Sequence, residues 1–162
     1  MANPYSSLVN DALYKAKLQR KLLVLTEEQR DKTAEVRALL LSHREALFYH
    51  LVCAYRLFLR ELAHAQNLSI TLLQHASELR GAGDSAEAIR LDELEKTPNS
   101  FLAIILREER KAWAIHAGAE ASRSPADLIS VVSVAEDCED LQQLIEAMQK
   151  VIAECRETLI EW

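Results

Sequence analysis

The sequence is poor in the residues that interrupt helices. Of its 162 residues, only three are glycine and three are proline. An all-β protein needs more turn-forming residues, because glycine and proline supply the backbone angles of tight turns. The same shortage argues against a glycine-rich phosphate-binding loop, and neither GxGxxG nor GxxxxGK occurs. The sequence therefore predicts an all-α protein, with a length that suits a single domain over residues 1–162.

Cysteine, positive charge and long apolar runs are also scarce. Three cysteines without CxxC spacing indicate free thiols in a reducing compartment. A net charge of −6 disfavours nucleic acid as a partner, because non-specific binding to it needs a basic surface. No window of 18 apolar residues predicts a membrane span, and the N-terminus lacks the apolar core of a signal peptide. We therefore expect a cytoplasmic protein.

The strongest helical pattern lies in the stretch Ala34–Ala65, which predicts one long central helix. Its apolar residues recur at steps of three, four and seven, as on one face of a helix. They form a stripe broad enough to contact neighbours on two sides. The members of this stripe are Val36, Leu40, Leu47, Leu51, Ala54, Phe58, Leu62 and Ala65.

Capping signals predict the bounds of the N-terminal helices. Asn3 and Pro4 suit the start of a first helix over residues 4–24. Thr26 and Gln29 have the spacing of a capping box, so the second helix is expected to begin near residue 27. It bends near residues 67–69 or continues to residue 80, before a glycine-rich break at residues 81–85.

Four further segments follow the break. A short helical piece is predicted over residues 85–94, and Thr97 with Pro98 suits the start of a helix over residues 97–119. Another short helix is expected from Ser124 and Pro125. The last helix, over residues 137–161, has a heptad seam of Leu141, Ile145, Met148, Ile152, Cys155 and Leu159. Together these segments predict an antiparallel bundle of four main helices joined by short connecting helices.

One pair of residues has the spacing of a metal site. Glu61 and His64 form Glu-x-x-His, the motif that di-iron bundles place inside their core. Such a site needs a second Glu-x-x-His, but the residue three positions before each of the other histidines is leucine or tryptophan. We therefore expect no cofactor, and a metal-binding helical bundle that uses Glu61 and His64 remains an alternative.

A second alternative is enzymatic. Three Arg-x5-His spacings occur, and the best of them joins Arg44 to His50. They resemble the Arg-x4-6-His signature of HEPN-type helical ribonucleases, an all-α family. The resemblance implies that Arg44 and His50 would contact the scissile phosphate. The polar residue that often follows the family's arginine is Glu45 here, which departs from that pattern.

Because no complete catalytic template is present, we favour a non-catalytic interaction or regulatory protein. Its partner would be another protein or a second copy in a homodimer. Tyrosine, tryptophan and arginine are enriched at the residues that dominate binding energy, although the aromatic residues of a central helix can equally fill the core. The expected interaction surface comprises Tyr49, Tyr55, Arg56, Phe58, Arg60 and Trp162.

Three stretches also carry a resemblance at the level of the whole chain. They are the opening Asn3-Pro4-Tyr5, the central segment FYHLVCAYRLFLRELAHAQ and the ending LIEW. They resemble a family of small, uncharacterised, all-helical proteobacterial proteins, a domain of unknown function. The resemblance covers nearly the whole chain and implies a bacterial helical protein, with no activity attached.

Overall fold

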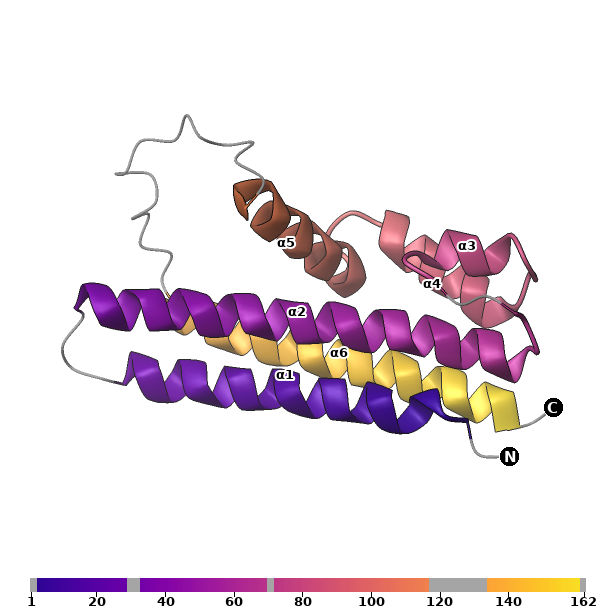
Figure 1. Ribbon diagram of the computed structural model, residues 1–162, viewed down its shortest axis with the longest axis horizontal. Helices are drawn as coiled ribbons and strands as arrows, with labels where there is room; N and C mark the ends of the chain where they lie inside the picture. Colours follow the sequence, from indigo (N-terminus) through magenta and orange to yellow (C-terminus); the bar gives the residue numbers. More distant parts are fainter. Residues whose placement is uncertain (1–2, 29–32, 70–71, 117–133, 161–162) are drawn as a thin grey trace.

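The computed structural model describes residues 3–28, 33–69, 72–116 and 134–160. Over these residues it contains six helices and no strand, so the all-α class predicted from the sequence is confirmed (Figure 1). The short helix expected from Ser124 and Pro125 lies outside the described residues, as does Trp162.

Three long helices lie side by side: α1 (Tyr5–Glu27), α2 (Ala34–Ala65) and α6 (Val134–Ile160). Figure 1 shows that α2 runs in the opposite direction to α1, whereas α6 runs in the same direction as α2. The long central helix predicted from the stretch Ala34–Ala65 is present as α2.

The three shorter helices lie on the side of α2 that faces away from α1. They are α3 (Ala76–Arg80), α4 (Ala86–Lys96) and α5 (Phe101–His116). α5 is inclined to α2, and it packs against α2, α4 and α6. The four longest helices are α1, α2, α5 and α6, and their assignment to an antiparallel four-helix bundle stays a prediction.

The predicted boundary between α1 and α2 was wrong. Thr26 does not start a new helix but lies within α1, where its side chain is buried. The N-cap of α2 is Thr33, whose side-chain oxygen accepts a hydrogen bond from the Val36 backbone N–H at 3.2 Å. Both threonines suit an N-cap. Burial against the core decides between them, because it holds Thr26 inside α1.

At its other end α2 neither bends nor continues. It ends at Ala65, and Asn67 adopts a left-handed backbone conformation with φ of 56°. The N–H of Leu68 donates to the carbonyl of Ala63 at 2.9 Å, which closes a Schellman motif. Asparagine tolerates this conformation better than other non-glycine residues, so Asn67 ends the helix where glycine would otherwise be expected.

The start of α5 also differs from the prediction. Thr97 caps the C-terminal end of α4, and its hydroxyl donates to the Glu93 carbonyl at 2.7 Å. The N-terminus of α5 is instead capped by Ser100, whose hydroxyl accepts from the Ala103 N–H at 3.0 Å. The predicted break after α3 is confirmed, because Ser85 caps α4.

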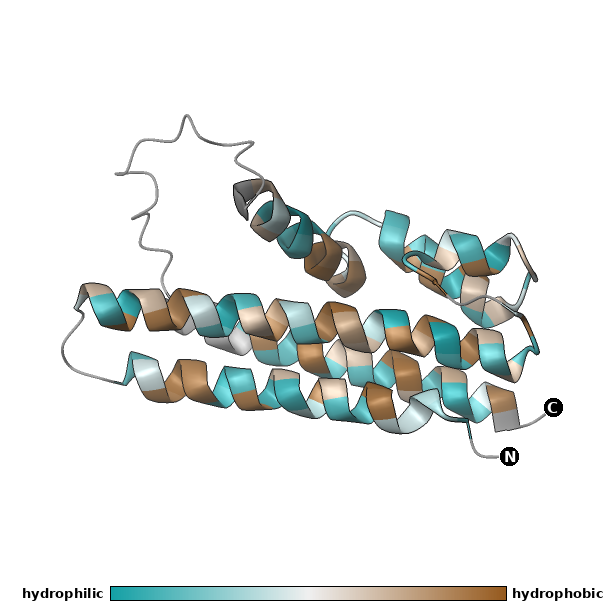
Figure 2. Cartoon of the chain, viewed as in Figure 1, coloured by the Kyte–Doolittle hydropathy of each residue, from teal (hydrophilic) through white to brown (hydrophobic). Residues whose placement is uncertain are grey.

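One core cluster takes buried residues from all six helices, with α2 as its largest contributor. The predicted α2 stripe is buried except at Ala65, and the predicted α6 seam is buried except at the half-buried Leu159. Figure 2 shows apolar and polar residues alternating along the long helices, with an apolar stretch near the C-terminal end of α1.

Candidate functional site

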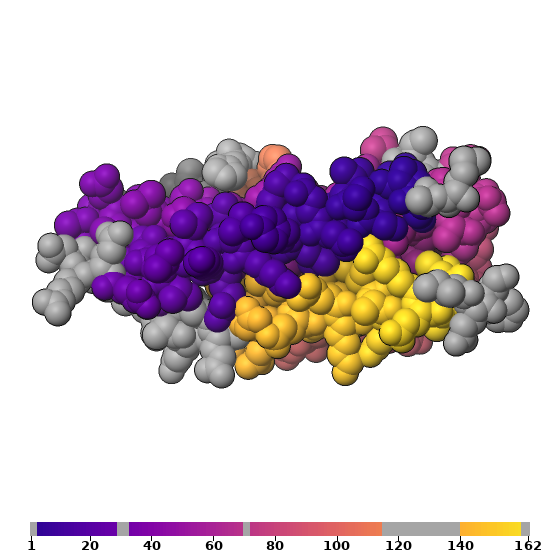
Figure 3. All heavy atoms as spheres, turned by 90° about the horizontal axis from the view of Figure 1, so that it is seen from below, coloured from indigo at the N-terminus to yellow at the C-terminus, as the bar shows by residue number. Residues whose placement is uncertain are grey.

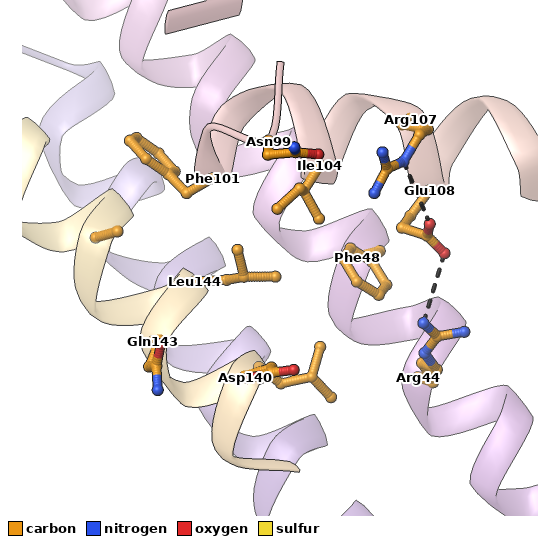
Figure 4. A pocket seen from close by; sticks show the side chains of 12 residues that line it. Arg44, Phe48, Asn99, Phe101, Ile104, Arg107, Glu108, Asp140, Gln143 and Leu144 are labelled. Atoms are coloured by element: carbon orange, nitrogen blue, oxygen red, sulfur yellow. Dashed lines mark ion pairs between the residues drawn. The ribbon is translucent and has the colours of Figure 1, made fainter. Parts of the chain in front are cut away.

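A pocket of about 560 Å³ opens where α5 diverges from α2 (Figure 4). We call it the α5 pocket. Its apolar wall combines Phe48 of α2, Phe101 and Ile104 of α5, and Leu141 and Leu144 of α6. The remaining lining residues are Arg44, Asn99, Arg107, Glu108, Asp140, Gln143 and Ala147. Volumes of about 300–1,000 Å³ are typical of ligand-binding pockets.

Glu108 organises the charge on one side of this pocket. Its carboxylate lies 2.7 Å from the Lys111 ammonium, 3.5 Å from the Arg44 guanidinium and 3.9 Å from the Arg107 guanidinium. The Arg44 guanidinium also lies 5.5 Å from the centre of the Phe48 ring, in cation–π contact. Three cations around one carboxylate leave this rim positively charged.

The opposite rim carries Asp140, which is exposed, and Gln143 from α6. Among the described residues that line the pocket there is no histidine, cysteine, serine or lysine. The described lining residues suit the binding of an apolar group flanked by charges.

The two residues of the ribonuclease alternative do not come together. Arg44 points toward α5 and its partner Glu108, whereas His50 is half-buried on the side of α2 that meets α1. Burial and the nearby charge of Lys15 lower the pKa of His50, although Asp11 acts in the opposite direction. The two side chains thus contact different helices, and they form no joint phosphate site.

The two residues of the metal alternative also have separate partners. The buried Glu61 carboxylate accepts two hydrogen bonds from Arg156, each 2.8 Å, and one from the Ser6 hydroxyl at 2.7 Å. His64 is exposed, and its ring lies 6.2 Å from that of Tyr5. Within the described part of the chain, no three histidine, cysteine, aspartate or glutamate side chains gather as a metal site.

The described members of the expected interaction surface differ in burial and in their partners. Tyr55 and Phe58 are buried in the core, whereas Tyr49 is exposed. Arg56 forms two hydrogen bonds to Glu109 of α5, at 2.6 and 2.9 Å. Arg60 is half-buried, and its Nε atom is buried without a hydrogen-bond partner among the described residues.

Tyr55 instead joins α2 to the short helices. Its hydroxyl donates to Glu95, which also accepts from the Ala76 N–H at 2.7 Å and lies 2.8 Å from Nδ1 of His75. Burial and the carboxylate of Glu95 raise the pKa of Tyr55 well above its ordinary value. The phenol therefore stays protonated and serves as a buried donor.

Sequence reasoning missed the α5 pocket and the partners of the charged α2 residues. Phe101 and Ile104 could be recognised as apolar positions of a helix, but nothing local in the sequence gives the inclination of that helix. Glu108, Glu109 and Arg156 follow no recognisable motif, so their pairing to α2 had no sequence signal.

Fold and site together define an all-helical protein whose charged α2 side chains form ion pairs to other helices and leave an apolar pocket beside them. The chain belongs to the Family of unknown function (DUF6586), which matches residues 1–162. No curated protein and no solved structure matches the chain.

Among the described helices, none is long and apolar enough to cross a membrane. The proteobacterial origin implied by the resemblance stays a prediction.

Proposed function

We propose that this protein is a non-catalytic binding protein that holds a segment of a partner protein in the α5 pocket. The observation that carries the proposal is the combination of an apolar wall with a charged rim. The described residues place no nucleophile and base side by side at this pocket. The ribonuclease and metal-binding alternatives are not proposed, because the residues that each needs contact different partners.

The chemistry of the pocket specifies the kind of segment. A leucine-sized or phenylalanine-sized side chain would fit in the space between Phe48, Ile104 and Leu144. Full burial of one such side chain contributes about 1.5–3 kcal/mol. The partner segment therefore needs at least one large apolar residue that is exposed in the free partner.

Charge complementarity adds a second requirement. Arg107 is half exposed, and its 3.9 Å separation from Glu108 leaves donors of its guanidinium available. An acidic residue beside the apolar anchor would pair with Arg107, since a guanidinium binds a carboxylate through two parallel hydrogen bonds. A basic or hydroxyl group on the other side of the anchor would meet Asp140. We thus expect an amphipathic segment that carries an acidic residue next to its apolar anchor.

The test compares matched variants on α5. Wild-type protein and the variants Arg107→Glu and Arg110→Glu are immobilised, and proteins captured from a lysate of the native cell are identified by mass spectrometry. Both arginines are exposed on α5, but only Arg107 lines the pocket. A partner of the pocket should bind wild type and Arg110→Glu alike and bind Arg107→Glu at least about tenfold more weakly, equivalent to about 1.4 kcal/mol.

The partner found in this way is then purified and titrated against Ile104→Asp and Leu41→Asp. Leu41 is exposed outside the pocket, so its variant controls for added surface charge. Binding that survives Ile104→Asp unchanged would place the partner elsewhere and contradict the proposal.

A further inference from the structure

The outward face of α1 carries an apolar stripe that the core does not use. Its members are Tyr14, Leu18, Leu22 and Leu25, which are 60%, 40%, 40% and 50% exposed. Their spacing of four, four and three residues places them along one face of the helix. The buried residues of α1, among them Val9 and Leu23, lie on its opposite face. We call these four residues the α1 stripe.

The stripe lies at the surface of the molecule. Figure 3 shows α1 along one face, beside α6 and uncovered by the other described helices. A contiguous apolar row on an otherwise polar helix face is typical of an interaction site. The steps between Leu18, Leu22 and Leu25 are four and three, the spacing at which two helices pack side by side.

The charges beside the stripe indicate what covers it. Lys17 and Glu28 are both exposed and lie 11 positions apart, close to three full turns, so they share one flank of the stripe. One flank therefore has a positive charge near its middle and a negative charge near its C-terminal end. A second helix with the same charges fits this flank when it runs in the opposite direction.

We propose that a second copy of this chain docks on the α1 stripe, with the two α1 helices antiparallel and related by a two-fold axis. Leu18 of each copy lies opposite Leu25 of the other, and the two Leu22 side chains meet near the axis. In this register Lys17 comes within one helical turn of Glu28 of the second copy, and the two-fold axis repeats the pair. The α5 pocket lies on another face, so the dimer does not depend on the proposed function.

The same register makes one unfavourable contact. The two Lys21 side chains lie close to the axis on the same flank, where like charges repel.

The contact is also small, because the 23 residues of α1 span only about 34 Å. Stable interfaces bury roughly 800 Å² per partner, which one helix face does not reach. The dimer should therefore be reversible and concentration-dependent, with a dissociation constant in the micromolar range.

Sedimentation equilibrium of the purified full chain over a range of concentrations tests the dimer. The wild-type mass should rise from 18.3 kDa toward twice that value as the concentration increases. Leu22→Asp should raise the dissociation constant at least about tenfold. Leu41→Asp changes an exposed leucine outside the stripe, and it should leave the constant unchanged. Circular dichroism checks that both variants remain folded.

Charge variants test the register separately. Lys17→Glu and Glu28→Lys should each weaken the dimer, and the double variant should restore it, because the swapped charges again pair across the axis. Lys21→Gln should tighten the dimer by removing the repulsion. Failure of the double variant to restore the dimer would overturn the antiparallel register.

Two outcomes would overturn the dimer itself. One is a wild type that stays at 18.3 kDa at every concentration, and the other is a dimer that Leu22→Asp leaves intact. If the wild type is monomeric and Leu22→Asp abolishes the capture of a lysate protein, the stripe belongs to a different partner. Arg107→Glu should not affect the dimer. Failure of the dimer proposal can therefore be distinguished from failure of the function proposed for the α5 pocket.

Discussion

Replacing Arg156 with methionine should destabilise the protein by about 3 kcal/mol, because the change leaves a buried carboxylate without its main partner. The side chain of Glu61 is only 5% exposed, and both of its oxygens accept from the Arg156 guanidinium at 2.8 Å. Arg156 also donates to the side chain of Asn10 at 3.0 Å. In the variant, the Ser6 hydroxyl is the remaining side-chain donor to the carboxylate among these contacts.

For Arg156→Met, the expected loss of unfolding free energy lies at the lower end of the range usual for a broken buried ion pair. Breaking a buried ion pair by removing one partner typically costs about 3–5 kcal/mol. The Arg156 side chain is 27% exposed, so water can enter the space that its guanidinium leaves and solvate Glu61 in part. For a chain of this length, about 3 kcal/mol corresponds to a fall in Tm of about 6–12 °C.

A double-mutant cycle separates the loss of the pair from other effects. Glu61→Leu removes the buried charge, so Arg156→Met should cost little in that background, and the coupling energy should be at least about 2 kcal/mol. Urea unfolding followed by far-UV circular dichroism gives each free energy, provided that the m-value stays constant. A loss below about 1 kcal/mol for Arg156→Met, or additive effects in the cycle, would refute the reasoning.

Two further predictions concern the ends and the neighbours of α2. Asn67 has φ of 56°, so Asn67→Gly should stabilise the protein by about 0.5 kcal/mol and Asn67→Val should destabilise it by about 1–2 kcal/mol in urea unfolding. A valine variant as stable as wild type would contradict this account. Burial and the carboxylate of Glu95 raise the pKa of the Tyr55 phenol. The protonated phenol therefore contributes stability that is fully present below the unfolded pKa of about 10. This contribution is lost as the pH rises above that value. The free energy of unfolding of the Tyr55→Phe variant should therefore fall less steeply above about pH 10 than that of wild type. Parallel curves of unfolding free energy against pH for wild type and variant would count against the buried phenol.

Secondary structure could largely be predicted because its signals are local. The α6 seam from Leu141 to Cys155 follows from heptad spacing alone, and each of its members is buried. Helix ends were harder wherever two residues could serve as the same cap. Thr26 and Thr33 have equal intrinsic suitability, and only the burial of Thr26 in the assembled core selects Thr33.

The candidate site could not be predicted, because its contacts join residues that are far apart in the chain. Arg56 and Glu109 are separated by 53 positions, and Arg156 and Glu61 by 95. Motif spacing in the sequence therefore suggested sites made of Glu61 with His64 and of Arg44 with His50. The members of each pair are close together along α2. Their actual partners depend on which helices pack together, and a single sequence carries no direct record of that.

Two ion pairs join α2 to α5 near the α5 pocket. Arg44 and Arg56 lie 12 positions apart, about 18 Å along α2, and they bind the adjacent residues Glu108 and Glu109. Adjacent residues point about 100° apart around a helix, so the two pairs act on different sides of α5. Both pairs join α5 to α2 beside the buried Leu102, Ile105 and Leu106 of α5, and the pocket lies between α2, α5 and α6. Arg44, which the sequence pairs with His50 as a catalytic candidate, thus serves as a contact between α2 and α5.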